Sequence, residues 1–312
     1  MKSGEILLEV VRNEMVESVH SGHLLILDGA GKTVVSIGDP DEIIYPRSAI
    51  KSLQASAMLR CGLKLSPYQL AIVCASHAGS QAHLENVRSI LSSAGLDESA
   101  LKNTPDKPLG LTERTAWGDR PATSLAANCS GKHSGMVATC VANGWDTASY
   151  KSVDHPLQIE IRKEIEALIG GSIPHVGVDG CGAPLFAMSL RAMAKAVRSM
   201  RISGDPVHNE VVSACMSNPV MVSGIGRLPT LLMEKIPGLF VKDGAEGVMV
   251  TSLDDGSVMV WKMSDGSQRG ASSLAIAGLA KLGVTVELEG DRVYGDGRVV
   301  GEIHASKLVH HD

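Results

Sequence analysis

The 312-residue sequence predicts an α+β fold in which both ends of the chain assemble one antiparallel sheet, with a helical region between them. Residues 24–36 and 247–262 each read as a β-hairpin, because apolar runs flank turns rich in Gly and Asp. In the middle of the chain, apolar residues instead recur with helical spacing. Residues 1–312 are expected to form a single domain, in which the sheet and the helical region are at most two closely packed subdomains.

The first half of the chain is predicted to contain the hairpin, two helices and one buried strand. Gly95 lies just beyond the second helix and is typical of a helix stop. A Pro-rich loop is expected at residues 104–121. In order, the predicted elements are the hairpin at 24–36, a helix from Ser48 to Leu59, a buried strand at 70–75 and a helix from His83 to Leu91.

In the second half, helices come first and strands dominate toward the end. Residues 156–169 have the clearest amphipathic pattern, with Pro156 at the start. The other predicted elements are an apolar helix at 136–141, a strand and turn at 176–184, a helix at 185–197, the hairpin at 247–262, a helix at 270–282 and short strands at 284–303.

Composition excludes several classes of function. Hydrophobic residues make up 44% of the chain and charged residues 20%, the balance of a folded globular protein. Aromatic residues are only 3% and the net charge is −5, which disfavours stacking on nucleic-acid bases and contact with a phosphate backbone. No apolar run reaches membrane-spanning length, and the N-terminus lacks a signal-peptide core. We therefore expect a cytoplasmic protein, without nucleic-acid or membrane partners, whose six cysteines are mostly reduced.

Ser48-Ala49-Ile50-Lys51 is the most informative stretch of the sequence. Residues three apart lie on one face of a helix, so the Lys51 amine comes within reach of the Ser48 hydroxyl. A neutral amine can take the hydroxyl proton, and a Ser-Lys pair can therefore perform nucleophilic catalysis without a histidine. The tetrad alone is weak evidence for catalysis, because a helix N-cap serine followed by a solvated lysine has the same spacing.

Two further positions are candidates for the same chemistry. Ser76, followed by His77, is predicted to follow a buried strand and could be a second hydroxyl in a proton relay, although a turn or N-cap serine is the simpler reading. Lys262 ends a strongly β-patterned strand, where an edge lysine that discourages aggregation is the simpler reading.

Two Gly-rich turns carry cysteines that could share a metal ion. Cys129 lies in the turn Cys-Ser-Gly-Lys that ends at Lys132, and Cys181 lies in Asp-Gly-Cys-Gly. Thiolates favour zinc over magnesium or calcium. Lys132 is an unusual ligand because it must lose its proton to bind, and a pair of buried thiols remains an alternative.

Taken together, these motifs resemble the asparaginase II family, the Rhizobium etli-type, thermolabile class of L-asparaginase. The segments that carry the resemblance are Tyr-Pro-Arg-Ser-x-x-Lys at 45–51, Cys-Ala-Ser-His at 74–77, Asn-Cys-Ser-Gly-Lys-His at 128–133, Asp-Gly-Cys-Gly-Ala-Pro at 179–184, Ser-Gly-x-Gly-Arg at 223–227 and Lys-Asp-Gly-Ala-Glu-Gly at 242–247.

The resemblance implies a fold similar to serine β-lactamases and penicillin-binding proteins, a homodimer, and hydrolysis of L-asparagine to L-aspartate and ammonia. It implies one zinc ion per chain that is not needed to generate the nucleophile. The implied catalytic residues are Ser48, Lys51, Ser76 and Lys262, and the implied metal ligands are Cys129, Lys132 and Cys181.

The substrate is expected to lie among Arg47, His77, Asp179 and Gly180, with Arg47 as a fork for the α-carboxylate. A base lysine must be neutral near pH 7, which requires burial or a second cation to lower its pKa. Either lysine could activate Ser48. The alternatives are a Ser-Lys amidase or peptidase acting on another amide, and a non-catalytic amino-acid sensor that binds asparagine without turnover.

Overall fold

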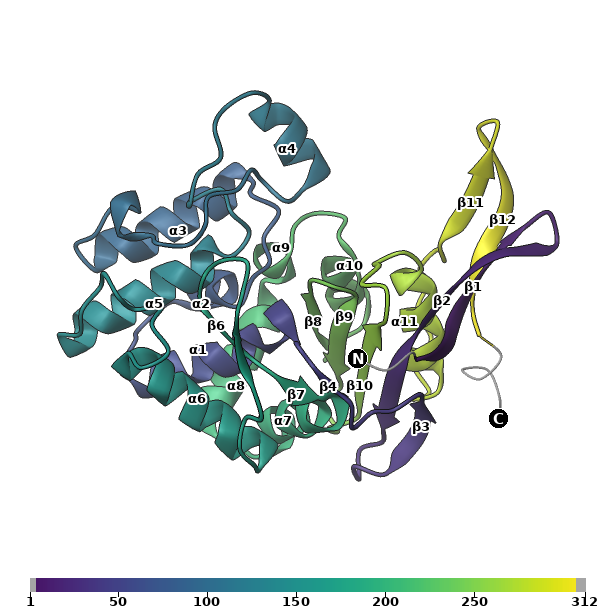
Figure 1. Cartoon of the computed structure of the whole chain (residues 1–312), viewed down its shortest axis with the longest axis horizontal. Helices are drawn as coiled ribbons and strands as arrows, with labels where there is room; N and C mark the ends of the chain where they lie inside the picture. Colours follow the sequence, from purple (N-terminus) through teal and green to yellow (C-terminus); the bar gives the residue numbers. More distant parts are fainter. Residues whose placement is uncertain (1–3, 307–312) are drawn as a thin grey trace.

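The computed structural model describes residues 4–306 and contains an eight-stranded antiparallel sheet beside a helical region (Figure 1). The main path of the sheet has the order β11-β12-β1-β2-β10-β9-β8, and β3 pairs with β2. The strands are β1 (Glu5–Arg12), β2 (Met15–Leu27), β3 (Thr33–Ile37), β8 (Phe240–Gly244), β9 (Val248–Ser252), β10 (Val258–Met263), β11 (Arg292–Gly295) and β12 (Arg298–Ala305). The predicted α+β fold, with a sheet built from both chain ends, is confirmed.

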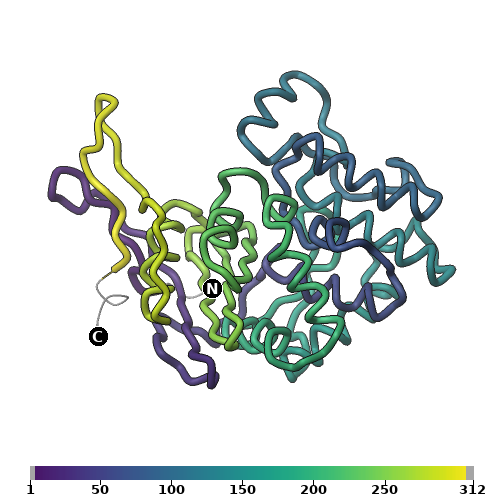
Figure 2. The backbone as a smooth tube through the Cα atoms, turned by 180° about the vertical axis from the view of Figure 1, so that it is seen from behind, coloured from purple at the N-terminus to yellow at the C-terminus, as the bar shows by residue number. Residues whose placement is uncertain are grey.

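Two antiparallel pairings join the ends of the chain. Strand β1 lies between β2 and β12, and β2 also pairs with β10, where Leu24 lies opposite Trp261. Within the buried half of β2, Leu24 to Leu27 form a continuous apolar run, which suits a strand that is covered on both faces. Figure 1 shows β1, β2, β11 and β12 projecting away from the helical region, and Figure 2 shows the same arrangement from behind.

The helices all follow the 3₁₀ turn η1 (Arg47–Ile50) in the described part of the chain, and most of them lie on the β8 side of the sheet (Figure 1). Helix α7 packs against β2, β9 and β10, whereas α11 packs against β12. The helices are α1 (Lys51–Arg60), α2 (Pro67–Val73), α3 (Gln81–Ser93), α4 (Leu111–Trp117), α5 (Ser130–Asn143), α6 (Pro156–Ile169), α7 (Leu190–Ile202), α8 (Pro206–Ser217), α9 (Pro219–Val222), α10 (Leu228–Lys235) and α11 (Ala271–Ala280).

Residues 70–75 were expected to form a buried strand, but they belong to helix α2 and its C-terminal end. A capping box starts the helix: the Ser66 side chain accepts from the Gln69 backbone N–H, the Gln69 side chain reaches back, and Pro67 occupies the first turn. A short helix that is buried all round has the same continuous apolar pattern as a buried strand, which explains the error.

The predicted helix at 185–197 begins later than expected. Strand β6 (Pro184–Phe186) pairs with β5 (Val176–Val178), and β7 (Met188–Ser189) pairs with β4 (Ile43–Ile44). Helix α7 then starts at Leu190, where the Ser189 side chain accepts from the Ala192 backbone N–H. These small sheets hold residues 43–47 beside residues 178–181.

Close backbone packing places η1 against the sheet. Turn η1 contacts β8 and β9, and a Cβ at Gly244 would lie 2.5 Å from the Pro46 carbonyl oxygen. Only glycine permits this approach of β8 to the turn that precedes α1. The end of β8 is thereby fixed beside Ser48.

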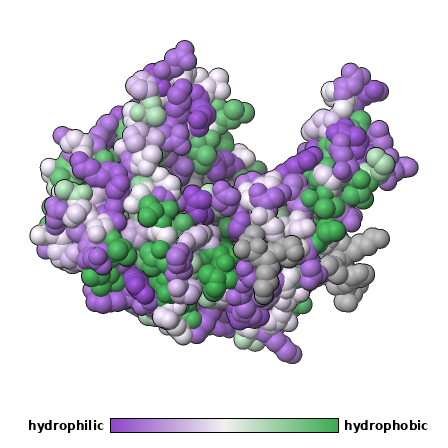
Figure 3. Space-filling view, in the orientation of Figure 1, coloured by the Kyte–Doolittle hydropathy of each residue, from purple (hydrophilic) through white to green (hydrophobic). Residues whose placement is uncertain are grey.

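Buried apolar side chains of the sheet and the helical region form one large cluster. On the outside, Figure 3 shows polar and apolar residues interspersed, with a hollow between the helical region and the projecting strands. Among residues 4–306, no helix has the length and apolar character needed to cross a membrane.

Candidate active site

Ser48 lies in η1 at the border between two cavities. One, the serine chamber, has a volume of about 380 Å³ and is lined by Ser48 and Ser76. The other, the cysteine cleft, has a volume of about 410 Å³ and is lined by Ser48, Cys129 and Cys181. Arg47 precedes Ser48 with φ of 52°, a left-handed conformation that costs free energy for a non-glycine residue and is found most often at functional sites.

The expected spacing of Ser48 and Lys51 is realised as a tight turn, in which the Lys51 backbone N–H donates to the Ser48 carbonyl. The Lys51 side chain is 1% exposed, and its Nζ donates to the Ala75 carbonyl oxygen over 2.5 Å. Among the hydrogen bonds of residues 4–306, none joins Lys51 Nζ to Ser48 Oγ. Burial lowers the pKa of Lys51 to about 8, and the positive charges of Lys242 and Lys132 act in the same direction.

Ser76 lies just beyond the C-terminal end of α2 and lines the serine chamber. Its backbone N–H donates to the Val222 carbonyl oxygen, which fixes the segment between α2 and α9. Its Oγ accepts a hydrogen bond from Lys242 Nζ, at 2.9 Å. The structure therefore pairs Ser76 with a lysine that sequence reasoning did not select.

Lys242 is fully buried in β8, and its amine contacts three oxygen atoms. Besides Ser76 Oγ, it donates to Asp243 Oδ1 at 2.5 Å and to the Asp243 carbonyl oxygen at 2.6 Å. Burial lowers the pKa of Lys242, and the negative charge of Asp243 opposes that effect. Asp243 in turn accepts from Arg227, whose NH2 lies 3.1 Å from Oδ2.

Lys262 does not line either cavity that borders Ser48. Its Nζ donates to the carbonyl oxygens of Glu246 and Met263, both at 2.6 Å. It lines a third, larger cavity of about 670 Å³, the outer cleft, together with Tyr45, Arg47 and His175. Lys262 was expected to belong to the catalytic group, but the lysine that is hydrogen-bonded to Ser76 is Lys242.

Arg47, Asp179 and Gly180, three of the expected substrate-binding residues, lie together in the wall of the cysteine cleft. Arg47 Nε donates to Asp179 Oδ1 at 2.8 Å, and the same oxygen accepts from the Gly180 backbone N–H at 2.8 Å. Arg47 NH1 also lies 3.9 Å from a Glu246 carboxylate oxygen. A cation and an anion thus stand side by side within one cavity wall.

His77, expected to bind substrate, lines none of these three cavities and is fully buried. Its Nε2 lies 2.9 Å from Ser130 Oγ, and its ring stacks on His83 with 5.3 Å between centroids. Burial, with smaller contributions from neighbouring cations, lowers the pKa of His77 well below its usual range. The neutral ring therefore fixes the start of α5 rather than contacting the cavities.

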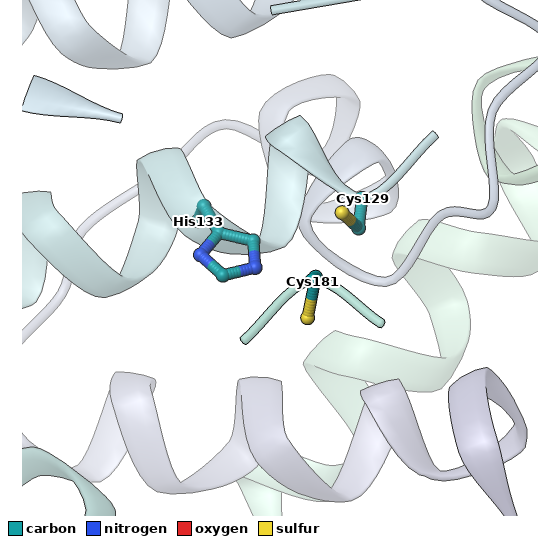
Figure 4. A group of neighbouring side chains, drawn as sticks. All are labelled: Cys129, His133 and Cys181. Carbon is teal, nitrogen blue, oxygen red and sulfur yellow. The ribbon is translucent and has the colours of Figure 1, made fainter. Parts of the chain in front are cut away.

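The two predicted cysteine ligands lie together, and a histidine joins them (Figure 4). Cys129 Sγ, Cys181 Sγ and a ring nitrogen of His133 all lie within 4.8 Å of one another. Lys132 is fully enclosed beside them, with Nζ 3.4 Å from Cys181 Sγ. Cys129 and His133 are four residues apart at the start of α5, so both side chains face the turn that carries Cys181.

The donor set fits a zinc ion, because soft thiolates and imidazole are its usual ligands. His133 Nδ1 lies 2.7 Å from the Tyr150 hydroxyl, whereas its buried Nε2 has no hydrogen-bond partner. Burial and the nearby cation Lys132 lower the pKa of His133 to about 4, so the ring is neutral, as a ligand must be. Burial alone would lower the pKa of Lys132. The neighbouring Cys181 and Cys129 have the larger combined effect and raise the pKa of Lys132 above its usual value.

Sequence reasoning missed four residues of this region: Arg227, Asp243, Lys242 and His133. Three of them lie in segments that were noted only as parts of the family pattern, and His133 follows the predicted ligand Lys132 directly. No sequence pattern singled out Lys242, because it and Lys262 both lie in short segments with apolar neighbours.

Several solved structures resemble this chain in fold. A putative β-lactamase from Bacteroides dorei is 11% identical with a TM-score of 0.43, over 80% of this chain and 86% of that one. A β-lactamase from Mycobacterium bovis is 14% identical with a TM-score of 0.32, over 79% and 88%. The protein named Mglu, in its native form, is 11% identical with a TM-score of 0.42, over 79% of this chain and 59% of that one. These similarities concern the fold alone.

In sequence, no curated protein matches the chain. Residues 8–305 match the L-asparaginase II family. That segment contains every residue of the serine chamber and the cysteine cleft described above. Because the match extends over nearly the whole chain, the protein belongs to the L-asparaginase II family and is, at that level, an asparaginase-type amidohydrolase.

Proposed function

We propose that this protein is an L-asparaginase that hydrolyses L-asparagine to L-aspartate and ammonia, with Ser48 as the nucleophile. The observation that carries the proposal is that Ser48 and Ser76 line one chamber of about 380 Å³, with a buried lysine near each: Lys242 is hydrogen-bonded to Ser76, and Lys51 lies in the same turn as Ser48. A hydroxyl becomes a strong nucleophile only when a neighbouring base accepts its proton. The buried lysine Lys51 can supply such a base without a histidine.

In this scheme Lys51 is the base for Ser48. It has no carboxylate partner among its hydrogen bonds within residues 4–306, and burial lowers its pKa to about 8. A substantial fraction of its amine is therefore neutral near pH 8. Ser48 Oγ attacks the side-chain amide carbon of the substrate, Lys51 accepts the hydroxyl proton, and an acyl-enzyme forms as ammonia departs.

The α-end of the substrate is proposed to lie in the cysteine cleft. L-Asparagine has an α-carboxylate and an α-ammonium group on one carbon, and the wall of the cleft offers Arg47 and Asp179 in contact. Arg47 suits the carboxylate because its planar guanidinium can form two parallel hydrogen bonds. Asp179 suits the ammonium group, and Gly180 leaves the cleft open beside them. The amide end then reaches Ser48, with Ser76 and Lys242 on the leaving-group side.

A zinc ion fits the group formed by Cys129, Cys181 and either His133 or Lys132. When bound, it would supply a fixed positive charge at the α-carboxylate side of the substrate. Ser48 and Lys51 already provide nucleophile and base. We therefore expect the metal to shape the cysteine cleft rather than to generate the nucleophile.

The test is ammonia release from L-asparagine by the purified protein, compared with Ser48→Ala and with Ser52→Ala as a matched control. Ser52 lies in the first turn of α1, and its buried Oγ has no hydrogen-bond partner. Loss of the nucleophile should lower kcat by about 10⁴-fold or more, whereas Ser52→Ala should behave like the native protein. Asparagine that binds without turnover would indicate a sensor, and turnover of other amides in preference to asparagine would indicate a different amidase.

A further inference from the structure

Lys242 and Asp243 are in direct contact, and the reaction proposed above assigns no role to Asp243. The Lys242 amine is fully buried and meets Asp243 Oδ1 at 2.5 Å and Ser76 Oγ at 2.9 Å. Consecutive residues of a strand usually point to opposite faces. Here β8 ends at Gly244, and the Asp243 carboxylate returns to the amine of its neighbour.

The carboxylate of Asp243 is itself fixed from the other side. Arg227 NH2 donates to Oδ2 over 3.1 Å, so each oxygen of Asp243 faces one cation. The Asp243 side chain is only 13% exposed and that of Arg227 is 26% exposed. The result is an unbroken chain of contacts from Arg227 through Asp243 and Lys242 to Ser76.

The two buried lysines therefore have opposite electrostatic surroundings. Lys51 Nζ donates to one neutral carbonyl oxygen, that of Ala75, and contacts no carboxylate within residues 4–306. Lys242 Nζ contacts a carboxylate directly. An opposite charge within about 4–6 Å favours the charged form of a group. The geometry thus distinguishes a lysine suited to be a base from a lysine suited to hold a proton.

We propose that Asp243 is a positioning residue that keeps the Lys242 amine protonated and directed at Ser76, so that this pair delivers the proton to the departing nitrogen. The proposal deepens the function proposed above and rests on it for the identity of the reaction. Arg227 holds the Asp243 carboxylate in place by its hydrogen bond to Oδ2.

The proton balance can be written for both halves of the reaction. As the C–N bond breaks, Ser76 Oγ gives its proton to the leaving nitrogen and takes one from Lys242 Nζ, and ammonia departs. In deacylation, water forms a bond to the acyl carbon, its proton passes through Ser76 to Lys242, and the bond to Ser48 Oγ breaks. Ser48 regains its proton from Lys51, so both lysines return to their starting states.

Other charges face Lys242 from the elements around it. The positive charges of Arg227 and Lys51 disfavour the protonated form of Lys242, whereas the negative charge of Asp243 favours it. The Cys215 thiol on α8 also lies close enough to act on Lys242. Burial lowers the pKa of Lys242, and Asp243 is the largest contribution that acts against burial. Burial opposes the ionised form of Asp243, but Lys242 and Arg227 outweigh it and lower the pKa of that carboxyl.

The experiment is a pH titration of lysine side chains in protein labelled with ¹³C at the lysine ε-carbon. The Lys242 signal is assigned by its loss in Lys242→Arg. In Asp243→Asn, Lys242 should lose its proton about 1–3 pH units lower than in the native protein, and Asp243→Glu should restore the native titration. In Arg227→Gln the side-chain amide can still donate to Asp243 Oδ2, so only a competing cation is removed and the titration should move to higher pH.

Asp265→Asn is the matched control, since Asp265 raises the pKa of Lys262 and is not among the groups that act on Lys242. It should move the Lys262 signal and leave Lys242 in place. An unchanged Lys242 titration in Asp243→Asn overturns the proposal. If that variant does not fold, Asp243→Ser takes its place, and an unchanged Lys242 titration there overturns the proposal as well.

Kinetics of the same variants give the second readout. With asparagine, Asp243→Asn should lower kcat by about 10²-fold and move the alkaline loss of activity to lower pH, with recovery in Asp243→Glu. Failure of the native protein to hydrolyse asparagine would refute the proposed function, but the lysine titration would still test Asp243. A shifted titration with native kcat would overturn the role of Lys242 as proton donor.

Discussion

The amine of Lys242 lies 2.9 Å from the hydroxyl of Ser76, although 166 positions separate them in the sequence. One residue follows helix α2 and the other lies near the end of strand β8. This contact adds a second serine–lysine pair to the Ser48-x-x-Lys51 motif, and the two serines line the same chamber. Catalysis by such a pair depends on the charge of each lysine.

Replacement of either candidate lysine by methionine separates their roles. Lys242→Met should lower kcat by about 10²–10⁴-fold, because a group that transfers protons to the leaving nitrogen is lost. Lys262→Met should lower it far less, since Lys262 Nζ donates to two carbonyl oxygens beside the outer cleft. Steady-state kinetics with asparagine measures both. Severe inactivation by Lys262→Met, with Lys242→Met still active, would restore Lys262 to the catalytic group.

This distinction could not be made from the sequence. Lys242 and Lys262 each occur in an apolar, β-patterned strand, and neither pattern tells which strand lies beside the turn at Ser48. Sheet order decides it: β8 contacts η1 directly, whereas β10 lies beyond β9. The closeness of Ser48 and Lys51 along one turn, by contrast, was predictable because it depends only on local helical spacing.

The fold shows the same division between local and long-range information. The hairpin of β9 and β10 and helix α6 were predicted because turn residues, Pro156 and amphipathic spacing act locally. The prediction of a strand at residues 70–75 was wrong because a short apolar run shows neither helical nor strand periodicity. The capping box at Ser66 and Gln69 was the local signal for a helix. The burial of His77, away from all three cavities, depends on its packing against His83 and Ser130, which no local pattern encodes.

The rate of asparagine hydrolysis should rise with pH through the titration of Lys51. The base must be neutral, and burial lowers the pKa of Lys51 to about 8. Below that pH most of the amine is protonated, so kcat should fall by about tenfold per pH unit. Above it the neutral form dominates and the rate should level off until Lys242 loses its proton. A rate that does not change between mildly acidic and mildly alkaline pH would contradict a lysine base.

Asparagine should be strongly preferred to glutamine. If Arg47 and Asp179 fix the α-groups, the extra methylene of glutamine moves the amide carbon away from Ser48. A misplacement of a reacting atom by about 1 Å can cost roughly 10²-fold in rate. The measurement is kcat/KM for both amides at one pH, with ammonia as the product. Equal values would show that the α-groups are not held at a fixed distance from Ser48.

The last prediction concerns the metal. One zinc ion per chain is expected by elemental analysis, because Cys129, Cys181 and His133 offer two thiols and an unpartnered ring nitrogen within 4.8 Å of one another. A double variant with Cys129→Ser and Cys181→Ser should lose the metal. As a control, Cys140→Ala removes a buried thiol from the same helix, outside this group, and should keep it.

The two functions open to the metal predict different kinetics for that double variant. The group borders the cleft that holds Arg47 and Asp179, whereas the nucleophile and its base need no hydroxide from a metal-bound water. Loss of a charge that acts on the α-carboxylate weakens ground-state and transition-state binding alike, which raises KM and leaves kcat nearly unchanged. We therefore expect KM to rise more than kcat falls. If kcat instead collapses as it does in Ser48→Ala while KM stays constant, the metal takes part in the chemical step and the two serine–lysine pairs are not sufficient for it.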